Sequence, residues 1–174
     1  SQAVNYEAWL GESIKAANKQ VYDMAKASRN DMGTTVVAAV VVDDEVYIGH
    51  AGDSRAYRVN AGRIEQLTTD HSLVERLVAT GQITREEARY HPQGNVVYRT
   101  IGDKAKLDVD TMQVRLAVDD CLLLCSDGLT GMVTDERIQQ IVGQAISPQN
   151  ACEELIRAAN AAGGDDNITV VIVK

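Results

Sequence analysis

The apolar positions of the chain recur with two different spacings, one typical of helices and one typical of strands. Leu10, Ile14 and Val21 follow a helical spacing, which predicts an amphipathic helix over about residues 6–27. Residues 34–42 are rich in β-branched side chains, which predicts a buried strand. Further strands are predicted over residues 46–50, 55–59, 63–67, 112–116, 121–126 and 168–173.

The polar segments between these strands carry the start signals of helices. Ser72 and Thr84 each lie three residues before a glutamate, which is the pattern of a capping box. Two more helices are predicted, one from Thr134 and one over residues 148–162. Because strands come in runs and helices come in runs, the predicted class is α+β with largely antiparallel sheets, in a single domain over residues 1–174.

The composition is that of an ordinary globular domain, and it narrows the range of partners. Of the 174 residues 45% are hydrophobic, the mean hydropathy is -0.18, and no apolar stretch approaches the length of a membrane span. The net charge of -8 argues against nucleic acid and anionic membranes as the main partners. A phosphoprotein substrate is compatible with this negative charge, because bound divalent cations can make the local electrostatic field positive. Three cysteines without motif spacing predict reduced thiols in a cytoplasmic protein.

Three aspartates at predicted strand ends are the candidate metal ligands: Asp53, Asp127 and Asp166. The strand before Asp127 ends there and the strand after Asp166 begins there, so antiparallel pairing would place both carboxylates at one end of a sheet. Asp53 closes a third strand and can reach the same edge. Crowded carboxylates require a cation, and oxygen ligands alone favour Mg²⁺ or Mn²⁺ over zinc.

A second interpretation of the same aspartates stays open. Asp-Gly and Asp-Asn pairs are common in turns, so any one of the three segments is more readily explained as a turn than as a ligand. All three segments lie at strand ends, which strengthens the case for a metal site. Judged by spacing alone, however, a metal site is no better supported than ordinary turns.

Seven short segments together carry a family resemblance. They are Met-Gly-Thr-Thr at 32–35, Gly-Asp-Ser-Arg-Ala-Tyr at 52–57, Leu-Thr-Thr-Asp-His at 67–71, the run at 81–88, His-Pro at 91–92, Leu-Cys-Ser-Asp-Gly-Leu at 124–129 and Gly-Asp-Asp-Asn-Ile-Thr-Val at 164–170. In this order they resemble the motifs of bacterial PPM-type (type 2C) metal-dependent serine/threonine protein phosphatases. The resemblance implies two antiparallel β-sheets sandwiched between helix layers. It also implies direct attack of a metal-activated water on phosphoserine or phosphothreonine, with no phosphoenzyme.

The resemblance assigns roles to particular residues. Asp127 and Asp166 match carboxylate ligands of two catalytic Mn²⁺ or Mg²⁺ ions, and Asp53 together with Asp127 matches the third-metal site of bacterial members. No side chain is implied as the catalytic nucleophile, because the metal-activated water takes that role. Residues 73–97 match the family's flap, which modulates substrate access; a solvated helical hairpin is the alternative. His71 is expected to be a satisfied hydrogen-bonding residue, with a general acid as the alternative.

The family pattern begins earlier than this sequence does. Its first strands carry an arginine that contacts the substrate phosphate, and an Asp-Gly segment whose aspartate bridges both metals. In this sequence the Asp-Gly pair is Asp127-Gly128, which already belongs to a later motif. We therefore expect the N-terminal strands of the family to be missing here. Three explanations are open: the sequence is a fragment or a processed piece, another chain supplies the strands, or the protein is a degenerate relative.

The predicted function is that of a cytoplasmic signalling hydrolase. Its expected partners are phosphorylated proteins, namely a cognate serine/threonine kinase and its targets, with no nucleic acid and no membrane segment. Two alternatives remain: a non-catalytic phosphatase-like binding module, and a phosphatase of anti-sigma-antagonist proteins in stress signalling. The long polar flap at residues 73–97 favours the broad-specificity branch that opposes a kinase.

Overall fold

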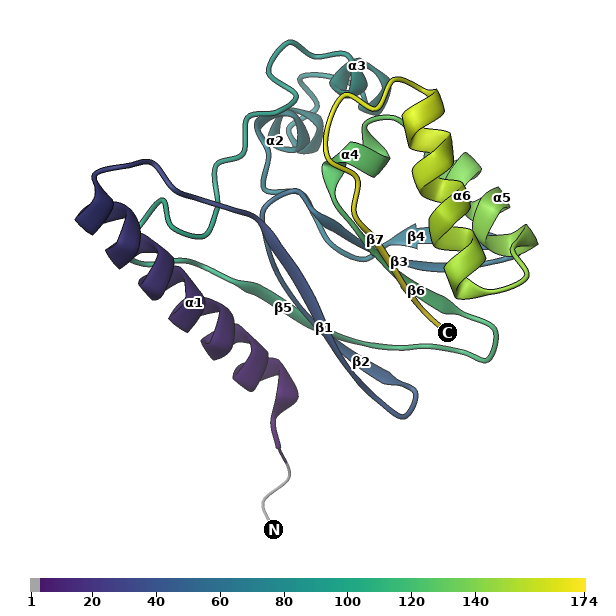
Figure 1. The fold of residues 1–174 in the computed structure, drawn as a ribbon, viewed down its shortest axis with the longest axis horizontal. Coiled ribbons are helices and arrows are strands. Elements are labelled where there is room, and N and C mark those ends of the chain that lie inside the picture. Colours follow the sequence, from purple (N-terminus) through teal and green to yellow (C-terminus); the bar gives the residue numbers. More distant parts are fainter. Residues whose placement is uncertain (1–3) are drawn as a thin grey trace. The chain divides into compact units, whose positions relative to one another are not determined.

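In the residues that the structure describes, 4–174, two structural units each carry an antiparallel sheet with its own helices (Figure 1). The structure is a computed structural model. The first unit comprises the residues up to Asp53 together with Asp70–Arg115, and the second comprises Ser54–Thr69 and Leu116–Lys174. The predicted α+β class with two antiparallel sheets is confirmed. The assignment of residues 1–174 to a single domain stays a prediction.

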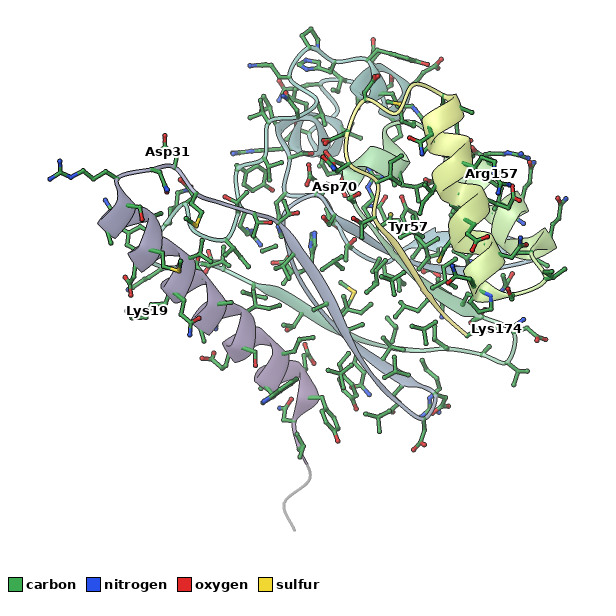
Figure 2. All side chains as sticks on the ribbon, viewed as in Figure 1. Lys19, Asp31, Tyr57, Asp70, Arg157 and Lys174 are labelled. Atoms are coloured by element: carbon green, nitrogen blue, oxygen red, sulfur yellow. The ribbon has the colours of Figure 1, made fainter. Side chains whose placement is uncertain are left out.

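The first unit carries a three-stranded sheet packed against a long helix. Its elements are α1 (Tyr6–Ser28), β1 (Val36–Val42), β2 (Glu45–Ala51), α2 (Leu73–Ala79), α3 (Arg85–Arg89) and β5 (Asp110–Arg115), and its strand order is β1-β2-β5. Gly49 in β2 lets α1 approach closely, because a Cβ there would lie 2.6 Å from Ile14 Cδ1 and 2.9 Å from Leu10 Cγ. The outward side of α1 carries exposed ion pairs, such as Lys19 with Asp23 at 2.5 Å (Figure 2).

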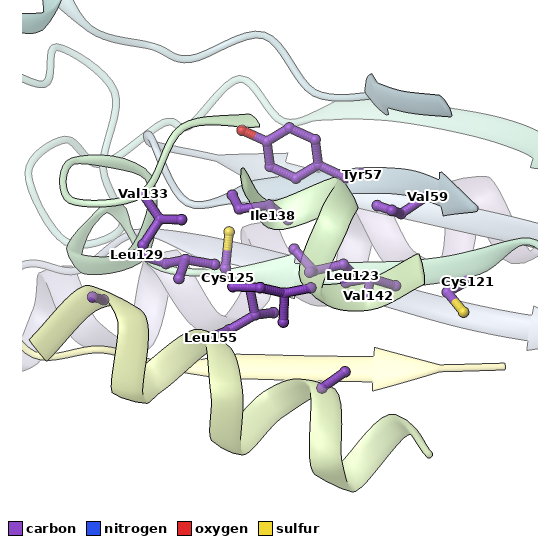
Figure 3. Packing of buried hydrophobic residues seen from close by; sticks show 13 residues of the cluster. Tyr57, Val59, Cys121, Leu123, Cys125, Leu129, Val133, Ile138, Val142 and Leu155 are labelled. Carbon is purple, nitrogen blue, oxygen red and sulfur yellow. The ribbon is translucent and has the colours of Figure 1, made fainter. Parts of the chain in front are cut away.

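The second unit carries a four-stranded sheet covered by helices. Its elements are β3 (Arg55–Asn60), β4 (Arg63–Gln66), β6 (Cys121–Cys125), α4 (Asp127–Thr130), α5 (Asp135–Gln144), α6 (Pro148–Ala161) and β7 (Val170–Val173), in the strand order β4-β3-β6-β7. The core of this unit gathers side chains from the sheet and from all three helices, and Leu123, Ile138 and Leu155 in it are fully buried (Figure 3). Burial of these aliphatic side chains is the main force that holds helices to sheet.

Tyr57 joins β3 to the start of α5 within this core. Its ring is fully buried, and its hydroxyl donates to Asp135 Oδ1 at 3.2 Å while it accepts from Arg55 at 2.9 Å. Burial raises the pKa of the Tyr57 hydroxyl above its ordinary value, so the group stays protonated and remains a donor. The buried hydroxyl is thus satisfied on both sides, as a core tyrosine requires.

The structure differs from the sequence prediction mainly at the ends of strands. The strand predicted over residues 34–42 begins at Val36, and Thr34 makes a single isolated bridge to Ile101 instead. The strand predicted over 168–173 begins at Val170. The four-residue helix α4 was not predicted, because a segment this short shows no periodicity. None of the helices in residues 4–174 combines the length and the apolar character needed to cross a lipid bilayer.

The flap predicted over residues 73–97 contains α2 and α3, and hydrogen bonds close it at its base. Leu73 N donates to Val96 O at 2.8 Å, and Ser72 pairs with Val97 in an isolated bridge. The capping box of Thr84 is present as predicted, and the Ser72 side chain caps α2. An ion pair between Arg85 and Glu75 links the two short helices.

Candidate metal centre

The pairing of β6 with β7 brings two predicted ligands to the same end of one sheet. Cys125 is the last residue of β6, and it pairs with Val170, the first residue of β7. Asp127 follows β6 as the first residue of α4, and Asp166 lies in the turn that leads into β7. The antiparallel pairing expected for these two strands is therefore confirmed, and Asp127 and Asp166 stay predicted ligands.

Hydrogen bonds and one tight backbone contact hold the two aspartate segments against each other. Ser126 Oγ donates to Asn167 O at 3.0 Å and accepts from Thr169 N at 3.0 Å, while Ser126 N donates to Thr169 O at 3.1 Å. A Cβ at Gly128 would lie 2.4 Å from Asn167 O and 3.4 Å from the carbonyl carbon of Asp166. Only a glycine therefore lets the first turn of α4 lie directly on the turn that carries Asp166.

The carboxylates of Asp127 and Asp166 supply part of the ligand set that a hard divalent cation needs. Asp127 and Asp166 are both exposed, and Asp166 Oδ1 accepts a hydrogen bond from Asn167 N at 2.7 Å. Carboxylate oxygens are the ligands that Mg²⁺ and Mn²⁺ prefer. Across residues 4–174, however, no three His, Cys, Asp or Glu side chains gather closely enough to hold a metal ion. The structure thus brings together two of the three predicted ligands.

Asp53, the third predicted ligand, belongs to the first unit. It follows Gly52, whose φ of +122° lies in a region that side chains rarely adopt. A Cβ at Gly52 would also lie 2.4 Å from Cβ of Thr35, so the turn before Asp53 can be built only with glycine. Asp53 stays a predicted ligand.

His71 is buried in the first unit with both ring nitrogens close to polar atoms. Its Nδ1 accepts from Gly52 N at 3.0 Å, and its Nε2 lies 3.0 Å from Asp110 Oδ2. These contacts agree with the expected hydrogen-bonding role. Burial alone would raise the pKa of Asp110, but hydrogen bonds from His71 and Arg99 outweigh it and hold that pKa below its usual range.

His50 is a residue of this region that sequence reasoning treated only as part of a strand. Its ring stacks on His71 with a centroid distance of 4.6 Å, and it is 1% exposed. Neither ring nitrogen has a hydrogen-bond partner among the described residues. Burial lowers the pKa of His50 to about 4, so the ring is neutral at physiological pH. Its position in the alternating pattern of β2 was the available signal that it points inward.

Comparison with known proteins assigns the chain to a family. Residues 1–168 match the family model of protein phosphatase 2C, and the chain belongs to that family. It is 42% identical over 174 residues to the serine/threonine phosphatase stp of Listeria welshimeri, a match that covers 99% of this chain and 69% of that protein.

Solved structures agree with this assignment. The serine/threonine phosphatase Stp1 from Staphylococcus aureus matches with a TM-score of 0.93 and 39% identity, over 99% of this chain and 69% of that one. The catalytic domain of the serine threonine protein phosphatase PstP, in complex with two manganese ions, matches with a TM-score of 0.84 and 30% identity, over 99% of this chain and 72% of that one.

Proposed function

We propose that this protein hydrolyses phosphoserine and phosphothreonine in other proteins and so opposes a protein kinase. The observation that carries the proposal is the contact of Gly128 with the Asp166–Asn167 backbone, which brings Asp127 and Asp166 together in a member of the protein phosphatase 2C family. In this proposal residues 1–174 act as one phosphatase domain, and the substrates are targets of a cognate serine/threonine kinase.

The proposed chemistry needs divalent cations, and the manganese ions in the PstP catalytic domain support Mn²⁺ or Mg²⁺. Asp127 and Asp166 would hold the ions, with Asp53 as the ligand of a third. Such ions, when bound, lower the pKa of a water and neutralise charge on a phosphoryl group. The protein's own part is positional: Ser126 and Gly128 keep the two aspartate segments in register. No side chain serves as a covalent nucleophile.

The flap is proposed to select protein substrates. Arg85 pairs with Glu75 and the base is closed by Leu73 and Val96, so the flap is a preformed element rather than an open loop. A preformed flap can favour some protein sequences over others, which supports the kinase-opposing branch over an anti-sigma-antagonist phosphatase. The free thiols of Cys121, Cys125 and Cys152 support a cytoplasmic location, where cysteines stay reduced.

Hydrolysis of p-nitrophenyl phosphate and of a phosphothreonine peptide, with and without Mn²⁺, tests the proposal. Asp127→Asn should lower the Mn²⁺-dependent rate by about 100-fold or more, since even residues that only support a ligand cost about 10–100-fold. Asp165→Asn is the matched control, because Asp165 neighbours Asp166 but is not a predicted ligand. Equal rates for Asp127→Asn and the unmodified protein would refute the assignment.

One observation keeps a second candidate function in view. Because no three metal-binding side chains gather within residues 4–174, a phosphatase-like module that binds a phosphoprotein without hydrolysis is the alternative. Calorimetry distinguishes the two: phosphopeptide binding without any Mn²⁺ binding supports the module, and Asp127-dependent Mn²⁺ binding supports the enzyme.

A further inference from the structure

Two hydrogen bonds join His71 to a single glycine, Gly52, which immediately precedes Asp53. The backbone N–H of His71 donates to Gly52 O at 2.8 Å, and the backbone N–H of Gly52 donates to His71 Nδ1 at 3.0 Å. Both backbone polar groups of Gly52 are therefore held by one residue, and one of the two bonds depends on the imidazole itself. The side chain of His71 thus fixes the orientation of the peptide group that leads into Gly52.

The second ring nitrogen determines which tautomer can make this contact. Because Nδ1 accepts an N–H, it carries no proton, and the neutral ring has its proton on Nε2. That proton faces Asp110 Oδ2 at 3.0 Å, while Arg99 Nη1 lies 2.9 Å from the same ring nitrogen and donates to Asp110 Oδ1 at 2.5 Å. A carboxylate on one nitrogen fixes the tautomer and ring orientation, just as it does for histidines that bind metals.

Packing on the ring prevents His71 from turning away. The His50 ring stacks on it with an interplanar angle of 28°, and the Tyr98 ring lies 6.0 Å away. Tyr98 N also donates to His71 O at 2.9 Å, and the histidine is only 3% exposed. With Nδ1 and Nε2 both engaged, the ring is built to hold one geometry rather than to pass a proton to a substrate.

The glycine cannot hold this geometry by itself. Gly52 lacks a side chain to pack, and any other residue is excluded by its φ of +122° and by Thr35. Glycine is also the residue with the greatest conformational freedom. An external partner is therefore required to select one conformation of the turn before Asp53, and His71 is placed to do so.

We propose that His71 is a positioning residue for Asp53: its Nδ1 holds the Gly52 N–H, and the Asp110–Arg99 pair holds the ring in the tautomer that can accept it. This inference rests on the proposed function, in which Asp53 is a cation ligand. It gives Asp110 and Arg99 a role in cation binding although neither is a predicted ligand.

Two substitutions of His71 separate its two contacts. In His71→Asn the amide oxygen can occupy the place of Nδ1 and still accept from Gly52 N, whereas the contact with Asp110 is lost. In His71→Gln the amide nitrogen can reach the place of Nε2 and still donate to Asp110, whereas the acceptor for Gly52 is lost. We expect His71→Gln to weaken Mn²⁺ binding about 10-fold or more, and His71→Asn to restore affinity to within about threefold of the unmodified protein.

Mn²⁺ titration calorimetry on the unmodified protein, both variants and Asp53→Asn is the primary measurement. If Asp53→Asn leaves every Mn²⁺ binding event unchanged, Asp53 is not a ligand, and both its assignment and this inference are wrong. If Asp53→Asn weakens binding but His71→Gln does not, the metal assignment stands and the positioning role alone is overturned. A loss of equal size in His71→Asn and His71→Gln also overturns the acceptor role.

Measurements on the metal-free protein make the result independent of activity and of variant stability. The Gly52 amide should exchange slowly with solvent in the unmodified protein and in His71→Asn, and faster in His71→Gln. Proton–nitrogen correlation spectra of the unmodified protein should show His71 with a proton on Nε2 and none on Nδ1. A ring protonated on Nδ1 would overturn the inference even if both variants failed to fold.

Discussion

Replacing Gly128 by alanine tests the contact that brings the two predicted ligands of the second unit together. A Cβ at this position would lie 2.4 Å from Asn167 O and 3.0 Å from the carbonyl carbon of Asn167. Carbon and oxygen atoms ordinarily come no closer than about 3.3 Å, so the two segments must separate by about 1 Å. Both atoms belong to the backbone, and no rotation of a side chain can relieve the clash.

The substitution should weaken Mn²⁺ binding at the proposed site more than it destabilises the fold. Overpacking typically costs about 1–3 kcal/mol, whereas alanine returns up to about 1 kcal/mol as the better helix residue. The free energy of unfolding should therefore fall by about 1–2 kcal/mol. Metal–ligand distances tolerate only about 0.2 Å, so a separation of about 1 Å should lower Mn²⁺ affinity at least about 10-fold. A displacement of this size should also lower turnover about 100-fold.

Urea unfolding of the metal-free protein and Mn²⁺ calorimetry measure the two effects separately. Gly62→Ala is the matched control, because a Cβ there meets nothing closer than Asn60 Oδ1 at 3.8 Å. It should change the unfolding free energy by no more than about 0.5 kcal/mol. Unchanged Mn²⁺ affinity in Gly128→Ala would refute the reasoning, since the clash would then be absorbed without moving Asp127 or Asp166.

Three further predictions concern the rest of the chain. The pKa of His50 falls from 6.5 to about 4 on folding. The unfolded state therefore binds more protons within that window, and about 3 kcal/mol of stability is lost as pH falls through it. His50→Leu should flatten this pH dependence in thermal unfolding; an unchanged slope would contradict it. Asn18→Leu should lower the free energy of unfolding by about 2–5 kcal/mol, because it leaves Gly102 N and Lys104 O without their buried hydrogen-bond partner. Chemical denaturation measures this loss, and an unchanged stability would contradict the prediction. Thr84→Ala should destabilise α3 by about 1 kcal/mol, seen as faster amide exchange in the flap but not in α6.

The elements with a clear period or a clear cap could be predicted from the sequence. The helix predicted over residues 6–27 is α1, Tyr6–Ser28, because apolar side chains at helical spacing pack on one sheet. The capping box at Thr84 depends on residues three apart and is visible in any sequence. The helix α4 has four residues, too few to show a period, and its Gly128 lies against Asn167, a contact that only the folded chain provides.

The same distinction separates the predicted ligands from the residues proposed to support one of them. The placement of Asp127 and Asp166 at one end of a sheet could be predicted, because the adjoining ends of two strands that pair antiparallel meet at the same sheet edge. The contacts of His71 could not, because Gly52 lies 19 residues away and Asp110 lies 39 residues away, and no periodicity links such positions. A metal ligand needs a side chain with oxygen atoms, so candidate ligands can be recognised in the sequence from residue type and spacing. A positioning residue acts through its contacts in the folded protein. For His71 these contacts form only after β2, β5 and the base of the flap have come together, so the sequence does not reveal them. The substitutions at His71 are therefore the sharper test of the structure, while those at Asp127 are the sharper test of the chemistry.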